Sequence, residues 1–303
     1  MRLERIGNGP IISQKMSSSI GNNLNGATLI RVPDWIENPL GRYYIYFAHH
    51  RGRFIRLAYS DRVTGPWKIY EPGVLHVEDY DFLSHVEEGG VGHVASPDIF
   101  IDEKEKRLVM YFHSVKAGGT MKDQATYAAV SSDGLDFTAY PDIIGNFYFR
   151  SFLYGDWYYA FSTPAPRAGI GICTYRSKDL LSGWERGNDL FPDLDVRHSA
   201  VKVEKDRLVV LMSLRGAAPE SILGAYVDLS GGWNNWKESR PEILLQPERE
   251  WEGANLEITA SKFGPADPFE RHLRDPYIYS EEGNDYVLYS AAGEHSIALA
   301  TLF

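Results

Sequence analysis

The sequence carries one pattern that recurs along its length and restricts the folds open to it. A strand rich in aromatic and aliphatic residues is followed by a short loop and a further strand, and then, in the first four copies, by a Gly-bearing turn and a short closing strand. The rich strands are YYIYFAHH, RLVMYFHS, WYYAFST, RLVVLMS and DYVLYS, at residues 43–50, 107–114, 157–163, 207–213 and 285–290. Self-similarity of this kind indicates a repeat architecture.

An apolar strand precedes each of these, so each copy predicts four strands, and no useful length of chain shows the period of an amphipathic helix. The fifth copy ends at Phe303 after its third strand, while NGPII, residues 8–12, resembles the closing strands. We therefore predict an all-β fold, a five-bladed β-propeller of four-stranded blades, built from residues 1–303 as a single domain. Its N-terminal strand completes the last blade and closes the ring. A pair of β-sandwiches is the alternative, but it leaves the N-terminal match unexplained.

Charge and composition exclude several classes of binding partner. The net charge is −10, which argues against a general nucleic-acid binder, because such binding rests on basic surface. No long apolar run predicts a membrane span or a signal peptide. We expect a cytoplasmic protein, or a secreted one whose leader is not part of this sequence. The single cysteine, Cys173, allows no intramolecular disulfide and no cysteine metal cluster. The oligomeric state is not predicted.

Polar residues gather where the repeat places one face of the ring. In a propeller the innermost strand of each blade lines the central channel, and the loop between the second and third strands opens on the same face as the start of that strand. The predicted inner strands begin with Asn25, His93, Ser96, Asp98, Arg150, Arg197, His198, Arg274 and Asp275. The loops on that face add His49, His50, Arg53, Glu87, Glu88, His113, Arg167, Arg215, Glu220, Trp251, Glu252, Glu257, Glu294 and His295. Such convergence predicts a functional site at the channel mouth.

The chain resembles the five-bladed propeller glycoside hydrolases, the broad group around family 43. The resemblance rests on the blade pattern and on the motifs SPDIF, residues 96–100, and RDPYIY, residues 274–279. It implies an inverting hydrolase with an Asp base, a Glu acid and a second Asp that tunes the acid. By blade order, Gly26 (beside Asn25) stands where the base would be, Arg150 where the tuning Asp would be and His198 where the acid would be, so this chain departs from the family triad. Some relatives in the wider group use a His as acid, which makes His198 a candidate.

Other carboxylates are candidates for the chemistry. Inverting hydrolysis needs an acid and a base roughly 6.5–9.5 Å apart. Asp275 is our candidate base, because the neighbouring Arg274 favours its ionised form. Glu220 is the candidate acid and Glu252 a second one. Asp98 either takes part or ties two blades together, and an ion pair between Arg274 and Asp275 that only staples the channel mouth is the structural alternative.

The arginines predict the substrate. Guanidinium groups suit carboxylates and sulfates, so Arg150, Arg197, Arg274 and Arg215 favour an anionic sugar such as a uronate. If they pair with carboxylates of the chain instead, the site suits a neutral sugar. The predicted substrate-binding residues are Asn25, His93, Asp98, Arg150, Arg197, Arg274, Glu252 and Trp251.

Three functions fit this pattern, and each predicts a carbohydrate partner. The first is hydrolysis of an oligosaccharide. The second is a polysaccharide lyase, in which His, Arg and Tyr abstract a proton next to a neutralised uronate carboxylate. The third is a sugar-binding propeller without catalysis. No ligand spacing along the chain is diagnostic of a metal, so no cofactor is predicted, although a structural ion in the channel is left open.

Overall fold

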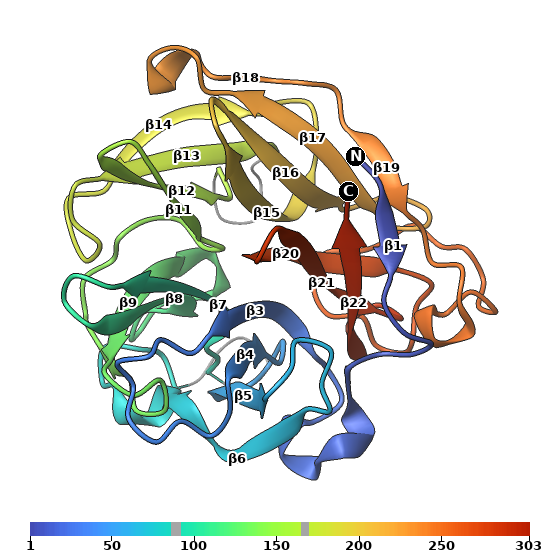
Figure 1. The fold of residues 1–303 in the computed structure, drawn as a ribbon, viewed down its shortest axis with the longest axis horizontal. Coiled ribbons are helices and arrows are strands. Elements are labelled where there is room, and N and C mark those ends of the chain that lie inside the picture. Colours follow the sequence, from blue (N-terminus) through green and yellow to red (C-terminus); the bar gives the residue numbers. More distant parts are fainter. Residues whose placement is uncertain (86–91, 165–169) are drawn as a thin grey trace.

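Five antiparallel sheets form a ring around a central channel in a computed structural model that describes residues 1–85, 92–164 and 170–303 (Figure 1). The five-bladed β-propeller predicted from the repeat is confirmed. The helices of the described residues are short 3-10 turns: η1 (Gln14–Met16), η2 (Ser18–Ile20), η3 (Val77–Asp79), η4 (Met121–Asp123), η5 (Trp233–Asn235) and η6 (Glu250–Glu252). None of these is long or apolar enough to cross a membrane.

Each blade runs outward from an inner strand. Blade 1 contains β3 (Asn25–Arg31), β4 (Tyr43–Ala48), β5 (Phe54–Ser60) and β6 (Lys68–His76). Blade 2 contains β7 (Ala95–Asp102), β8 (Arg107–Val115), β9 (Gln124–Ser131) and β10 (Thr138–Ala139). Blade 3 contains β11 (Arg150–Tyr154), β12 (Trp157–Ser162), β13 (Ile172–Ser177) and β14 (Glu185–Leu190).

The last two blades depart slightly from this plan. Blade 4 contains β15 (Val196–Glu204), β16 (Arg207–Leu214) and β17 (Ile222–Asp228), against which β18 (Lys237–Glu238) and β19 (Glu242–Leu245) both pair. Blade 5 contains β20 (Leu273–Glu281), β21 (Asn284–Ala291) and β22 (Ser296–Leu302). The inner strands β3, β7, β11, β15 and β20 contact one another in turn around the channel (Figure 1).

The N-terminal segment closes the ring against β22. β1 (Leu3–Arg5) pairs Leu3 with Leu302, and β2 (Ile12–Ser13) pairs Ile12 with Ile297. The predicted closing segment, residues 8–12, therefore contributes only its last residue to a strand. Two features explain the break: Pro10 has no N–H to donate to a ladder, and Gly7 turns the chain with a φ of 79°.

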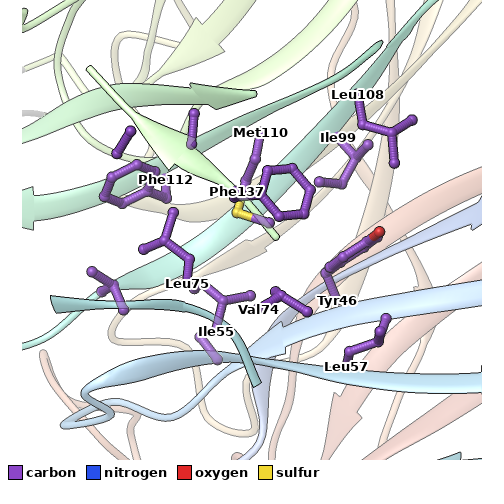
Figure 2. Close-up of a cluster of buried hydrophobic side chains, with 14 of the residues drawn as sticks. Tyr46, Ile55, Leu57, Val74, Leu75, Ile99, Leu108, Met110, Phe112 and Phe137 are labelled. Carbon is purple, nitrogen blue, oxygen red and sulfur yellow. The ribbon is translucent and has the colours of Figure 1, made fainter. Parts of the chain in front are cut away.

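Apolar side chains fill the wedges between neighbouring blades. Figure 2 shows the cluster between blades 1 and 2, where Tyr46 and Leu57 face Ile99 and Met110. Phe137, from the turn before β10, completes it and packs edge-on against Tyr46 with the ring centroids 5.8 Å apart. Burial of apolar surface contributes roughly 25 cal/mol per Å². Because the wedges are packed, the starts of the inner strands are held in fixed relative positions.

A buried carboxylate attaches the N-terminal strand to the ring. Glu252 is fully buried and binds Nε and one terminal nitrogen of Arg5, both at 2.8 Å. It also accepts hydrogen bonds from the Tyr289 hydroxyl at 3.0 Å and from the backbone N–H groups of Glu248 and Arg249. Removal of one partner of such a pair leaves an uncompensated charge in the interior.

We expect Arg5→Met to lower the free energy of unfolding by about 3 kcal/mol, because it strands the Glu252 carboxylate inside the protein. Urea denaturation followed by fluorescence measures this. The control is Glu4→Gln in the same strand, which breaks an ion pair with Arg2. The Arg2 side chain is 68% exposed and the Glu4 side chain 53%. That change should be below about 0.5 kcal/mol. Equal effects of the two substitutions would show that the Arg5–Glu252 pair does not attach the N-terminal strand to the ring.

Candidate functional site

Three inner strands begin with the same irregularity of the backbone. Gly26, Ser96 and Asp275 have φ angles of 57°, 48° and 52°, and the strand register shifts beside each of them. Bulges of this kind re-aim a side chain. A Cβ on Gly26 would approach the Cα of Ser96 to 2.9 Å, so this position is restricted to glycine. The unusual start of the RDPYIY motif is therefore a bulge that directs the Asp275 side chain toward blade 1.

Asp275 and His198 form a buried pair across the channel mouth. Oδ2 of Asp275 accepts hydrogen bonds from the Ser290 hydroxyl at 3.2 Å and from the Gly26 N–H at 3.4 Å. Oδ1 lies against Nδ1 of His198. On the other side of the imidazole, Nε2 has no hydrogen-bond partner among the described residues. The pair thus leaves one buried ring nitrogen available to a ligand.

A small cavity lies beside this pair. Its volume is about 30 Å³, which is room for two or so water molecules. The lining residues are Asn25, His50, His93, Ala95, Ser96, His113, Gln124, Tyr148, His198 and Phe263. The Tyr148 ring stands edge-on between two of them, 4.6 Å from the His113 ring and 4.0 Å from the His198 ring. The cavity wall therefore consists of aromatic rings, imidazoles and uncharged amide and hydroxyl groups.

Arg274 and Arg197 hold Glu220 between them. Nε of Arg274 lies 3.0 Å from one Glu220 oxygen, and Nε of Arg197 lies 2.8 and 3.1 Å from the two oxygens. The terminal nitrogens of Arg274 reach Glu294 at 3.2 Å and Glu270 at 2.8 Å. Within the described residues, Arg274 pairs with these carboxylates and not with Asp275, so the structural alternative of an ion pair between those two neighbours does not hold.

Asp98 and Arg150 join blades 2, 3 and 4. Oδ2 of Asp98 accepts hydrogen bonds from the Ser151 N–H at 2.8 Å and hydroxyl at 2.6 Å, and Arg150 lies 3.5 Å from Oδ1. Arg150 also donates to the backbone carbonyls of Pro97 and Ser199. This is the inter-blade tie that we considered for Asp98. One terminal nitrogen of Arg150 has no hydrogen-bond partner among the described residues, and the guanidinium lies 5.6 Å from the centroid of the Tyr277 ring.

The structure brings together only part of the predicted site. Asn25, His93 and His198 line the cavity, while Asp275 lies directly behind His198. Glu252 is taken up by Arg5, and Trp251 packs on an apolar cluster between blades 4 and 5, so neither lines the cavity. The candidates Glu87, Glu88 and Arg167 lie outside the described residues.

Sequence reasoning missed several lining residues. Tyr148, Gln124 and Phe263 were not among the predicted set. Tyr148 precedes an inner strand within the run NFYFRS, where an aromatic residue looks like part of the core. Its φ of 66° turns the side chain out of the sheet. A positive φ is uncommon at a residue other than glycine, so the sequence alone does not predict it.

Burial sets the charge of the cavity wall. It lowers the pKa of His198 well below the ordinary value, as do the nearby guanidinium groups of Arg150 and Arg197, so the imidazole is neutral at neutral pH. Burial likewise lowers the pKa of His113 and raises the pKa of Tyr148 to about 12. Neutral imidazoles and a protonated phenol can exchange protons with a bound molecule.

Glu294 is an ionised group beside this wall. Burial opposes its ionisation, but His50, Arg274 and Arg197 together hold its pKa well below the usual range. His50 Nδ1 lies 3.2 Å from Glu294 and also lines the cavity. Within the described residues, no group of three or more His, Cys, Asp or Glu side chains is arranged to hold a metal ion.

Comparison with solved structures places the fold among the family 43 glycoside hydrolases. A thermostable family-43 glycoside hydrolase superimposes with a TM-score of 0.64 at 13% identity, over 93% of this chain and 90% of its own. The GH43_1 enzyme from Xanthomonas citri complexed with xylotriose gives 0.59 at 13% identity, over 97% and 88%. A GH43 β-xylosidase/α-arabinofuranosidase from a compost microbial metagenome gives 0.59 at 13% identity, over 99% and 94%. At these identities the likeness shows the fold alone.

One relative by sequence is much nearer. The uncharacterized protein R118 of Acanthamoeba polyphaga mimivirus is 31% identical over 310 residues, which cover 92% of this chain and 83% of that protein. The chain therefore belongs to the same family as R118. No family model matches the sequence.

Neutral buried histidines make the fold sensitive to acid. Burial, with Arg274 and Arg197, lowers the pKa of His272 to about 4, whereas a histidine in an unfolded chain titrates near 6.5. Between these values the unfolded chain binds the extra proton, so the free energy of unfolding falls as the pH falls from about 6.5 to about 4. Nδ1 of His272 accepts a hydrogen bond from the Glu220 N–H at 2.9 Å, which fixes the neutral form.

We expect His272→Asn, which keeps an acceptor for that N–H, to reduce the slope of unfolding free energy against pH by about 1.4 kcal/mol per pH unit in this window. Urea denaturation at a series of pH values measures the slope. The control is Thr28→Val, which removes a buried hydrogen bond to the Pro97 carbonyl but no titrating group. It should lower stability equally at every pH. An unchanged slope in His272→Asn would refute the assignment.

Proposed function

We propose that this protein is a glycoside hydrolase that cleaves its substrate at the channel mouth, with His198 as the group that moves the proton. The fold it shares with family 43 glycoside hydrolases supports a carbohydrate-cleaving enzyme. The observation that carries the proposal is the buried pair of Asp275 and His198, which leaves Nε2 of the imidazole unpartnered at the cavity among the described residues.

The pair defines a role for each member. An Asp275 carboxylate at Nδ1 favours the tautomer with the proton on that nitrogen, so Nε2 of this cavity-lining residue carries the free lone pair. Since the lowered pKa keeps His198 neutral at neutral pH, Nε2 accepts a proton from the attacking water as the general base. Asp275, which the sequence suggested as the base itself, then orients the imidazole and stabilises the imidazolium that forms.

The leaving oxygen needs a proton donor. Glu220, the acid predicted from the sequence, pairs with Arg197 and Arg274. Among the described residues, it does not line the cavity. Tyr148 lines the cavity beside His198, and its pKa of about 12 keeps the phenol protonated. We assign the donor role to Tyr148 and a positioning role to Glu220.

A sugar unit is larger than the cavity, so part of the wall has to yield. Phe263 is 52% exposed and comes from the segment between η6 and β20. Its ring lies 5.6 Å from the Arg215 guanidinium, a contact that stabilises by roughly 0.5–1 kcal/mol at an exposed site. We propose that the reacting sugar enters as the Phe263 side chain turns outward, at small energetic cost.

Of the four predicted arginines, only one could bind a charged substrate group. Arg197 and Arg274 already hold carboxylates of the chain, and Arg215 pairs with Asp195. Of these four arginines, Arg150 keeps a buried terminal nitrogen without a partner among the described residues. A uronate substrate would have to reach that nitrogen from the cavity, whose lining does not include Arg150. The amides, the hydroxyls and the neutral His113 and His198 imidazoles of the wall suit a neutral sugar. Matched neutral and uronate substrates therefore belong in the test.

The test is a panel of neutral and uronate oligosaccharides, followed for reducing ends and ultraviolet absorbance together. We expect new reducing ends without absorbance, and a loss in kcat of about 10²–10⁴-fold in His198→Gln and in Asp275→Asn. Glu204→Gln, which alters an ion pair with Arg207 on the opposite side of blade 4, is the control and should retain full activity.

Other outcomes would assign the protein elsewhere. Ultraviolet absorbance that rises with cleavage would identify a lyase, with Tyr148 and His198 acting on the proton next to a uronate carboxylate. Binding without cleavage would identify a carbohydrate-binding propeller. Cleavage that survives in both His198→Gln and Asp275→Asn would overturn the mechanism.

A further inference from the structure

A second, more open hollow lies beside the cavity. It has a volume of about 380 Å³, within the range of roughly 300–1,000 Å³ that ligand pockets occupy. Three segments line it: Asn22 and Asn23 before β3, the β4–β5 loop, and a stretch of the chain before β20. The lining residues are Asn22, Asn23, His49, His50, Arg51, Pro265, Ala266 and Asp267.

The hollow adjoins the cavity. His50 lines both spaces. The segment before β20 also borders both, because Phe263 lines the cavity and Pro265, two residues further on, lines the hollow. The two spaces therefore share a wall at His50.

The floor of the hollow is held in place by hydrogen bonds. Oδ1 of Asn23 accepts the backbone N–H of His50 at 3.0 Å, and its amide nitrogen donates to Glu294 at 2.6 Å. Nε2 of His49 lies 3.0 Å from Oδ1 of Asn22. Gly21 lies against the His49 ring, since a Cβ there would be 2.8 Å from a ring carbon and a larger residue would displace the ring. A preorganised floor of this kind reduces the entropy lost on binding.

The chemistry of the wall suits an uncharged, hydroxyl-rich molecule. Arg51 and Asp267 contribute one positive and one negative group, and burial with Arg56 lowers the pKa of His49 to about 4, so the imidazole is neutral. Pro265 and Ala266 add an apolar side. Polar groups of both signs opposite a small apolar surface match a sugar ring, which has hydroxyls at its rim and C–H groups on its face.

We infer that this hollow binds the sugar unit next to the one that reacts, so that the site takes a chain of at least two units whose second unit is uncharged. The inference rests on the proposed function, since it assumes that the cavity takes a sugar. A chain that also occupies the hollow then binds more tightly than a single sugar unit does. Arg51 and Asp267 are the residues on which that extra affinity depends.

Binding to the catalytically silent His198→Gln protein tests this apart from catalysis. Calorimetry compares each monosaccharide with its matching trisaccharide, from xylose and xylotriose to galacturonate and its trimer. We expect one neutral trisaccharide to bind at least about tenfold more tightly than its monosaccharide, as two added hydrogen bonds would give. Adding Arg51→Ala and Asp267→Ala should reduce that ratio to about threefold or less.

The control is Arg62→Ala in the same background. Arg62 lies in the β5–β6 turn at the other end of blade 1 and bonds to the Gly65 carbonyl, so the ratio should not change. Equal binding of monosaccharide and trisaccharide, or a ratio that survives the Arg51 and Asp267 substitutions, overturns this inference and leaves the proposed function standing. Binding of no member of the panel overturns the proposed function, and the inference with it.

Discussion

The channel mouth depends on the pairing of charges that the fold buries there. Arg274 links Glu220 from the β16–β17 loop to Glu270 and Glu294 of blade 5, and Arg197 of blade 4 shares Glu220. An unpaired charge at this depth would cost several kcal/mol. The network therefore fixes how blades 4 and 5 meet, and so where Asp275, the residue after Arg274, stands relative to His198, the residue after Arg197.

This arrangement separates structural charges from reactive groups. The arginines and glutamates satisfy one another behind the cavity, while the wall itself contains the neutral imidazoles of His113 and His198, a phenol and amides. Asp275 connects the two layers, because one oxygen is held by the Ser290 hydroxyl and the Gly26 backbone and the other lies against His198. A neutral wall backed by fixed charges suits proton transfer, since the imidazole can change its charge beside a carboxylate that does not move.

Much of the fold was open to prediction because blades repeat a local pattern. Strand, turn and closing strand follow each other within a short stretch of chain, and NGPII revealed the ring closure although Pro10 moved the pairing to neighbouring residues. The site was harder, because its contacts join distant residues. The sequence predicted Glu252 as a channel carboxylate, whereas in the structure it binds Arg5. The outward turn of Tyr148 depends on a φ of 66°, which the sequence does not predict.

The proposed proton transfer depends on the tautomer of His198. Nitrogen NMR of isotopically labelled histidines, with His198→Gln to assign the signal, reports which ring nitrogen carries the proton. We expect a proton on Nδ1 and an unprotonated Nε2 at neutral pH, with the Nε2 signal shifting when an oligosaccharide binds. A proton on Nε2 instead, or an Nε2 signal that is unchanged by every bound oligosaccharide, would contradict it.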